Sequence, residues 1–207
     1  MKLDLHIHSK YSKDSLLKPE TILKVSKKRG LNGIAVTDHN TIKGGLATKK
    51  MNVDENFTVI AGSEVKTEYG DIIGLFLQEE IVSRTFEEVV NEIKDQDGLV
   101  VLAHPFRKGF VFPSSLFIKI DLIEAFNARS PKSLNEKAFE LAKKHQKPIT
   151  AGSDSHLAFE IGGGKTITGP NCEECLIRGD TETEGMESNY YFAHGLSIFI
   201  ENIKLLV

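Results

Sequence analysis

The stretch LDLHIH at residues 3–8 places apolar side chains at the odd positions and polar ones at the even positions. This period of two predicts a β-strand with one buried face. Because alternate side chains of a strand point to the same side, His6 and His8 are expected to face the same way and to be able to bind one metal ion. A His-x-His pair alone is weak evidence, so the rest of the chain has to support this interpretation.

Short apolar runs and helical patterns alternate along the chain after this first strand. Strands are predicted at residues 33–37, 58–61, 72–77, 99–103, 122–126 and 148–151. A helix is predicted from Pro19 to Gly30, and another from the apolar spacing of Phe86, Val89, Val90 and Ile93, with Thr85 and Glu88 as a capping box. A third is predicted from Ser133 to His145, where Ser133 and Glu136 repeat the capping-box spacing. This alternation is typical of an α/β fold.

The last fifth of the chain has a different composition. Residues 162–186 are rich in Gly, Thr and acidic residues, which predicts a loop with one strand at 165–168. Residues 190–206 have Leu196, Phe199, Ile200 and Ile203 at helical spacing, which predicts a final helix packed on the core. No repeat or linker interrupts the pattern, so residues 1–207 are expected to form a single domain, with 166–207 as a loop and helix appended to it.

Composition sets limits on the class of protein. The 207 residues are 40% hydrophobic and carry a net charge of −3, which is unlike a general nucleic-acid binder with a basic excess. The two cysteines are too few for a disulfide framework and suit a reducing compartment. No signal peptide fits the amino terminus, and no apolar run reaches the roughly 18 to 20 residues of a membrane span. A cytoplasmic location without membrane contact is therefore expected.

Histidines and carboxylates follow the predicted strands at the points where the strands end. In a parallel α/β barrel the carboxyl ends of the strands meet at one face, so these side chains are expected to lie close together. Mixed nitrogen and oxygen ligands suit Zn, Mn or Fe. His145 and His194 stand outside this pattern and are expected to be structural. The residues at the strand ends are His6, His8, Asp38, His39, Glu64, His104, Glu124, Asp154 and His156.

Several stretches of the chain resemble the PHP family, named for polymerase and histidinol phosphatase domains. They are DLHIHSKYSKDS, GIAVTDHN, AGSE, VLAHPFR, IEAFN and AGSDSH followed by Ile161-Gly162, and they span residues 3–165 in the family's order. The resemblance implies a distorted (β/α)7 barrel with two or three divalent transition metals, Zn, Mn or Fe, at the carboxyl ends of the strands.

The resemblance also implies a role for individual residues. Asp38 and Glu124 are expected to orient ligands. Three metal sites are implied: a first held by His6, His8, Asp154 and a bridging Glu64; a second held by Asp14, His39 and His156; and a third held by Glu64 and His104.

One position departs from the family's pattern. Many members have a histidine before an Ile/Leu-Leu-Gly stretch, where it completes the site of His104, whereas this chain reads YGDIIG at residues 69–74. Two interpretations remain. Asp71 supplies an oxygen ligand in place of the histidine, or the position supplies none and the protein uses two metals.

The activity implied is that of a phosphoesterase in which a metal-bridging hydroxide attacks phosphorus. Glu64, Asp154, His156 and Asp38 are the expected catalytic residues. Arg107 and Arg129 are candidates for binding the phosphate, with surface solubility as the alternative. The expected substrate is a phosphomonoester or phosphodiester: a nucleotide, a short oligonucleotide or a small phosphorylated metabolite.

Two other functions stay open, a non-catalytic metal-binding PHP module and a metal-dependent amidohydrolase. Many amidohydrolases carry a carboxylated lysine where this chain has Glu64. No protein partner is indicated. The pair Cys172 and Cys175 is interpreted as incidental, and the GGGKT stretch at 162–166 lacks the spacing of a phosphate-binding loop.

Overall fold

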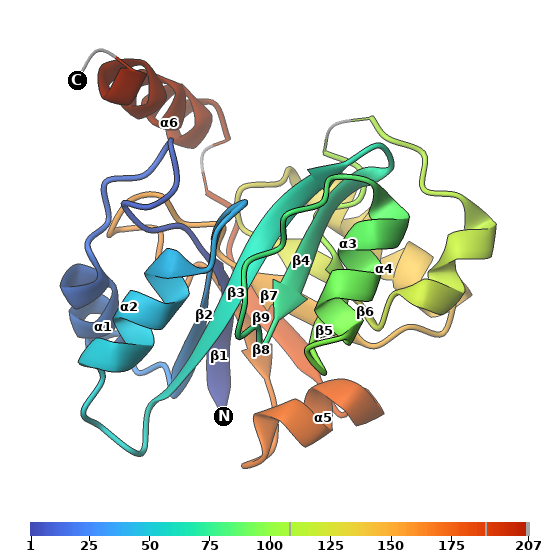
Figure 1. Ribbon diagram of the computed structural model, residues 1–207, viewed down its shortest axis with the longest axis horizontal. Helices are drawn as coiled ribbons and strands as arrows, with labels where there is room; N and C mark the ends of the chain where they lie inside the picture. Colours follow the sequence, from blue (N-terminus) through green and yellow to red (C-terminus); the bar gives the residue numbers. More distant parts are fainter. Residues whose placement is uncertain (108, 189, 206–207) are drawn as a thin grey trace.

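One continuous sheet organises the protein, as the computed structural model in Figure 1 shows for residues 1–107, 109–188 and 190–205. Within these residues nine strands follow the order β7-β6-β5-β4-β3-β2-β1-β8-β9. A parallel bridge between Ile7 and Ser155 joins β1 to the segment after β7 and bends the sheet into a nearly closed barrel, which confirms the predicted α/β barrel. The strands are β1 Lys2–Ile7, β2 Gly33–His39, β3 Thr58–Thr67, β4 Gly70–Leu75, β5 Leu99–Leu102, β6 Leu122–Asn127, β7 Ile149–Gly152, β8 Gly164–Ile167 and β9 Glu182–Gly185.

The expectation that the strands of the barrel are all parallel is wrong at β8, which pairs antiparallel with β1 and β9, and it is also wrong at β4. This strand pairs antiparallel with both β3 and β5, because β3 continues to Thr67 and a tight turn leads directly back into β4. Gly70 has a φ of 124° in this turn, a conformation that favours glycine. As a result, the first residues of β4 lie beside the carboxyl end of β3, and Asp71 pairs in register with Lys66.

Helices cover the outside of the barrel. Three of the four predicted helices are confirmed as α1 Pro19–Lys28, α3 Phe86–Lys94 and α4 Lys132–Lys144, and the fourth, in the tail, is α6 Tyr190–Leu205, with Leu206 outside the described residues. The chain also forms α2 Lys43–Met51, α5 Cys172–Arg178 and a short 3-10 helix η1 Ser114–Lys119. Part of the predicted loop at 162–186 is therefore α5 and β9.

The predicted capping boxes differ from the observed helix starts. Thr85 is the N-cap of α3 and its hydroxyl contacts Glu88 at 2.6 Å, but it makes no side-chain bond to a backbone N–H group. The capping box at Ser133 is wrong, because Pro131 is the N-cap of α4.

The apolar stripe of α3 packs fully into the core, as its spacing predicts. Phe86, Val89, Val90 and Ile93 are all buried in one cluster with side chains of β4 and β5. Burial of a side chain of this size contributes roughly 1.5–3 kcal/mol, so this stripe holds α3 against the barrel wall. Among the described residues, no helix has both the length and the apolar character needed to cross a bilayer.

Candidate metal centre

The predicted ligands come close together after the carboxyl ends of the strands. The carboxyl end of β1 lies at the end of the barrel opposite the amino terminus (Figure 1). Two of the predicted ligands follow directly after strands in unusual backbone conformations: His104 has a φ of 25° and Asp154 a φ of 54°. Positive φ at a non-glycine residue costs of order 1–3 kcal/mol and occurs preferentially at functional sites. Here the two residues with positive φ follow β5 and β7, and their side chains belong to a buried cluster.

A first set of ligand atoms comes from β1, β3 and the segment after β7. The Nε2 atoms of His6 and His8 lie 3.0 Å apart. Glu64 Oε2 lies 3.5 Å and 3.4 Å from these two nitrogens. Asp154 Oδ1 lies 3.6 Å and 3.2 Å from them. The four residues predicted for the first metal thus point one atom each at a common centre.

A second set joins the loop after β1 to the ends of β2 and β7. Asp14 Oδ2 lies 2.9 Å from His156 Nε2 and 3.4 Å from His39 Nε2. With His8, these residues place one ligand atom each within 4.8 Å of one another. The structure therefore brings Asp14, which stands in a loop, to the predicted histidines.

A third set contains the residue that replaces the family's histidine. Glu64 Oε1 lies 2.9 Å from His104 Nε2, and Asp71 Oδ2 lies 3.9 Å from His104 Nδ1. The antiparallel direction of β4 is what brings Asp71 to this end of the barrel. Its position favours the interpretation that Asp71 offers an oxygen ligand over the interpretation that the position supplies none.

The histidines of the cluster have opposite pKa shifts. Burial and the neighbouring imidazoles of His156 and His39 lower the pKa of His8 to about 3. Burial also acts against charge on His39, but the carboxylates of Glu64 and Asp14 outweigh it and raise the pKa of His39 to about 10. His8 is thus held neutral, as a ligand must be, whereas His39 holds a proton that a metal ion would have to displace.

The carboxylates stay ionised although they are buried. Burial would raise the pKa of Glu64, but the nearby His39 and His6 hold it well below its ordinary value. The pKa of Asp154 is likewise held low against burial, chiefly by Arg107. The carboxylate oxygens of Glu64 and Asp154 are therefore anionic and can bind a cation.

Neighbouring polar groups fix the orientation of the ligands. Glu124 Oε1 lies 2.8 Å from His6 Nδ1, and Glu124 Oε2 accepts the backbone N–H of His104 at 2.9 Å. A proton on Nδ1 of His6 leaves the lone pair of Nε2 directed at the cluster. Asp38 has a different place: it accepts the backbone N–H and the hydroxyl of Ser9, both at 2.6 Å, and so anchors the loop after β1.

The two candidate phosphate-binding arginines differ in their surroundings. Arg107 donates to Asp154 and, at 3.3 Å, to Asn127, so it lies directly beside the cluster. Arg129 is buried and donates to both carboxylate oxygens of Glu160 at 2.8 Å. The charge of Arg129 is therefore already paired within the protein.

A cavity of about 210 Å³ opens beside the cluster. Four of the residues that line it belong to α6, for which the sequence predicted only a packing role. Their spacing of i, i+3, i+4 and i+7 is a signal that sequence inspection could have used. The lining residues are Asp14, His39, Arg107, Arg129, Asp154 and His156 from the barrel, and His194, Ser197, Ile198 and Glu201 from α6.

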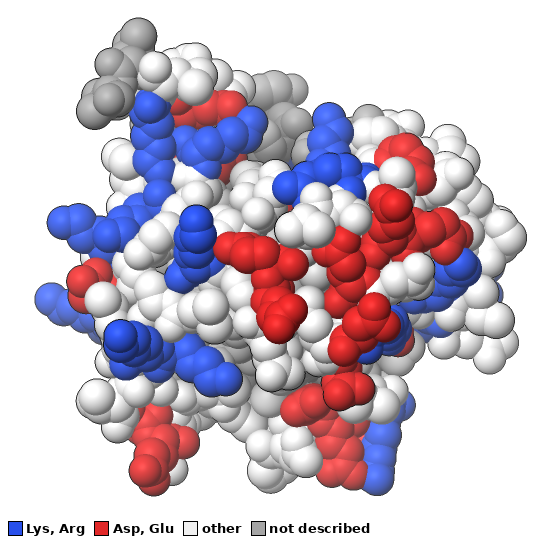
Figure 2. Space-filling view, in the orientation of Figure 1, with Lys and Arg blue, Asp and Glu red and all other residues white. Residues whose placement is uncertain are grey.

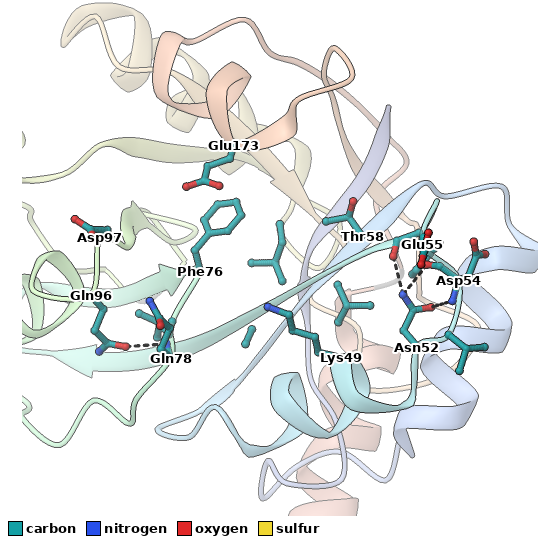
Figure 3. Close-up of a pocket in the computed structure, with 16 residues that line it drawn as sticks. Lys49, Asn52, Asp54, Glu55, Thr58, Phe76, Gln78, Gln96, Asp97 and Glu173 are labelled. Carbon is teal, nitrogen blue, oxygen red and sulfur yellow. Dashed lines mark hydrogen bonds between the residues drawn. The ribbon is translucent and has the colours of Figure 1, made fainter.

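A larger cavity of about 830 Å³ lies elsewhere, and Figure 3 shows Lys49, Phe76 and Glu173 around it. None of the described residues that line it is a predicted ligand. The larger of the two cavities is therefore not the one beside the histidine and carboxylate cluster.

Of the residues that the sequence assigned no role in the site, His194 lines the cavity, contrary to expectation, whereas the others have structural surroundings. His145 stacks on Phe117, with the ring centres 3.7 Å apart. Lys165 of the glycine-rich stretch lies in β8 and pairs with Glu184, so this stretch is not a phosphate-binding loop. Both cysteines are free, and burial raises the pKa of the Cys172 thiol, which makes it a poor nucleophile.

Fold and site together define a barrel-like α/β protein with a buried centre of histidines and carboxylates suited to metal ions. More specifically, the chain belongs to the PHP domain family, whose model matches residues 4–159. The Methanocaldococcus jannaschii protein MJ1587 is 43% identical over 141 residues, which cover 62% of this chain and 82% of that relative. A second protein of this organism, MJ0417, is 34% identical over 174 residues, 78% of this chain and 68% of the relative.

Solved structures share the fold at low sequence identity. A two-domain Bacteroides vulgatus protein, described as containing a predicted PHP-like metal-dependent phosphoesterase, has a TM-score of 0.79 at 17% identity. The match covers 90% of this chain and 65% of that protein. Endonuclease Q in complex with a duplex that carries an abasic lesion has a TM-score of 0.69 at 18% identity, covering 90% of this chain and 60% of the endonuclease.

Proposed function

We propose that this protein is a metal-dependent phosphoesterase that uses two or three divalent ions of Zn, Mn or Fe. One observation carries the proposal: the Nε2 atoms of His6 and His8 lie 3.0 Å apart, and each lies 3.2–3.6 Å from a carboxylate oxygen of Glu64 and from one of Asp154. Among the described residues, the buried Asp14 Oδ1 has no hydrogen-bond partner, and Glu64 Oε2 has none beyond its ion pair with His39 Nδ1 at 3.1 Å. A buried polar atom left unpaired costs about 1–3 kcal/mol, and a cation would remove that cost.

The side chains divide the work of hydrolysis. Bound divalent ions would activate water and stabilise charge on the phosphoryl oxygens. Arg107 lines the cavity and can donate to a non-bridging phosphate oxygen while keeping its contact with Asp154. Glu124 holds His6 and the backbone of His104 in place, so that the ligand geometry exists before substrate arrives.

A phosphoesterase fits better than an amidohydrolase, although one solved structure of similar fold is described as an amidohydrolase from Chromobacterium violaceum (TM-score 0.60, 16% identity). Many amidohydrolases need a lysine that faces the metals from a strand. In β3 the buried position at the centre is Glu64, and the lysine of this strand, Lys66, is exposed. A non-catalytic module would not need the open cavity beside the ligands, nor an arginine in its wall.

The surface charge favours small phosphorylated substrates over long nucleic acids. On the face shown in Figure 2, Lys and Arg lie over α1 and α2 and also around α6, while Asp and Glu gather over the region of α3. No continuous basic surface crosses this face of the described residues, whereas proteins that grip long nucleic acids present one. A nucleotide, a short oligonucleotide or a phosphorylated metabolite is the substrate class that follows.

The experiment starts from purified protein stripped of metal and reloaded with Mn, Zn or Fe. Hydrolysis is measured on p-nitrophenyl phosphate, bis-p-nitrophenyl phosphate, nucleoside monophosphates and short oligonucleotides. Asp154→Asn should abolish activity and lower the metal content, while the matched Asp180→Asn, on an exposed residue after α5, should change neither. If the metal-loaded wild type cleaves none of these esters, the proposal is wrong.

A further inference from the structure

One face of α6 is directed at the cavity beside the metal cluster. His194, Ser197, Ile198 and Glu201 all line it, and their spacing of i, i+3, i+4 and i+7 defines one side of a helix. The opposite wall is formed by the predicted ligands Asp14, His39, Asp154 and His156. The last helix of the chain is thus part of the site and not only a support for the barrel.

Polar contacts along its length fix α6 in this position. Ser197 Oγ accepts a hydrogen bond from Arg129 Nη1 at 2.9 Å. Glu201 pairs with Lys13 at 2.6 Å, and Lys204 Nζ donates to the carbonyl oxygens of residues 10 and 12 at 2.8 Å and 2.6 Å. The helix therefore bridges the loop that carries Asp14 and the segment that follows β6.

The size of the enclosed space limits what can bind. Sites that enclose drug-sized ligands have volumes of about 300–1,000 Å³, whereas this cavity measures about 210 Å³. It accommodates a phosphoryl group and the first part of its leaving group. A polynucleotide that continues on both sides of the scissile phosphate would need more room than this cavity offers, and α6 bounds the cavity on one side.

We propose that α6 is the specificity-determining wall of the site, which restricts substrates to phosphate groups at the end of a molecule: monoesters and the terminal nucleotide of a single strand. This inference rests on the proposed phosphoesterase function and deepens it. Ile198 is the apolar residue of α6 that lines the cavity, so a larger side chain there tests this wall.

The test compares two substitutions of the same residue type on the same helix. Ile198→Trp narrows the cavity, and Ile203→Trp alters a partly exposed position that does not line it. With Mn-loaded protein, Ile198→Trp should raise KM for adenosine monophosphate at least tenfold relative to Ile203→Trp. The wild type should cleave a linear single-stranded oligonucleotide from its end and leave circular single-stranded DNA intact.

Binding of adenosine monophosphate, measured by calorimetry in the presence of Mn, separates this inference from the function on which it rests. If hydrolysis occurs but the two tryptophan variants behave alike, or if circular DNA is cleaved as fast as linear DNA, the role of α6 is wrong and the phosphoesterase stands. If no ester is cleaved but Ile198→Trp alone weakens binding, α6 is a wall of the pocket and the reaction is wrong. If the wild type neither cleaves nor binds, both are overturned.

Discussion

Replacement of Arg129 by methionine tests whether this arginine holds the structure together or binds substrate. Its guanidinium forms two hydrogen bonds of 2.8 Å with Glu160 and one of 2.9 Å with Ser197 of α6. The exposed fractions of the two charged side chains are only 3% and 2%. Arg129→Met keeps most of the apolar stem and removes the charge, so Glu160 is left buried without its cationic partner.

The magnitude follows from that uncompensated charge. Breaking a buried ion pair by removing one partner costs about 3–5 kcal/mol. Glu160 keeps two other donors, the backbone N–H groups of His156 and Leu157 at 3.0 Å, which places the expected loss at the lower end. For a chain of this size, each kcal/mol lowers Tm by about 2–4 °C, so a decrease of roughly 6–12 °C is expected.

Urea unfolding and thermal melting of metal-free protein measure the loss directly. The matched control is Arg178→Met, whose pair with Glu174 is solvent-exposed and contributes about 0–1 kcal/mol. Adding Glu160→Gln to Arg129→Met should recover part of the stability, because it removes the orphaned charge. If Arg129→Met is no more destabilising than Arg178→Met, the pair is not structural and the arginine is available for phosphate.

Three further predictions concern the cluster and its supports. Mn²⁺ binding to metal-free protein should release protons, because the pKa of His39 is about 10, and the affinity should rise by up to about tenfold per pH unit for each proton; calorimetry giving equal affinities at pH 6 and pH 8 would contradict this. Glu124→Gln should weaken metal binding by roughly 10–100-fold, measured by competition with a chelator, and an unchanged affinity would rule out its orienting role. A Cβ at Gly44 would lie 1.8 Å from Asp38 Oδ2, whereas none of the described atoms lies within 4 Å of one at Gly195 in α6. In urea unfolding, Gly44→Ala should therefore destabilise by about 1–3 kcal/mol and Gly195→Ala should stabilise by about 0.5–1 kcal/mol; equal effects would refute the packing argument.

The barrel and the composition of the cluster were predictable because both depend on local patterns. Each strand is a short apolar run, and the polar residues at its end can be identified in the sequence without knowledge of the partner strands. His6 and His8 share a side because strand side chains alternate, a rule that needs no tertiary information. The fold family adds the order in which these ends meet, so ligands far apart in sequence, such as His39 and His156, could be grouped in advance.

Features that depend on distant partners or on short polar elements were not predictable. The helix α5 has only seven residues, with Glu173 and Glu174 in its first turn, and β9 alternates charged and small residues, so both are too short and too polar for a clear apolar pattern. The partner of Arg129 lies 31 residues further along the chain, and sequence alone does not distinguish a buried pair from a phosphate ligand. The direction of β4 depends on a turn of two residues, which the apolar run does not encode.

That direction also bears on the choice of metal. Because β4 is antiparallel, Asp71 meets Glu64 and His104, and this set offers two carboxylates and one imidazole. The set around Asp14 offers three imidazoles and one carboxylate. Oxygen-rich sites suit Mn, while imidazole suits Zn and Fe. Asp71 stands where the family has a histidine, so the set with Asp71 has more oxygen ligands than the set around Asp14. We therefore expect the protein to favour Mn at the set with Asp71 and Zn or Fe at the set with Asp14.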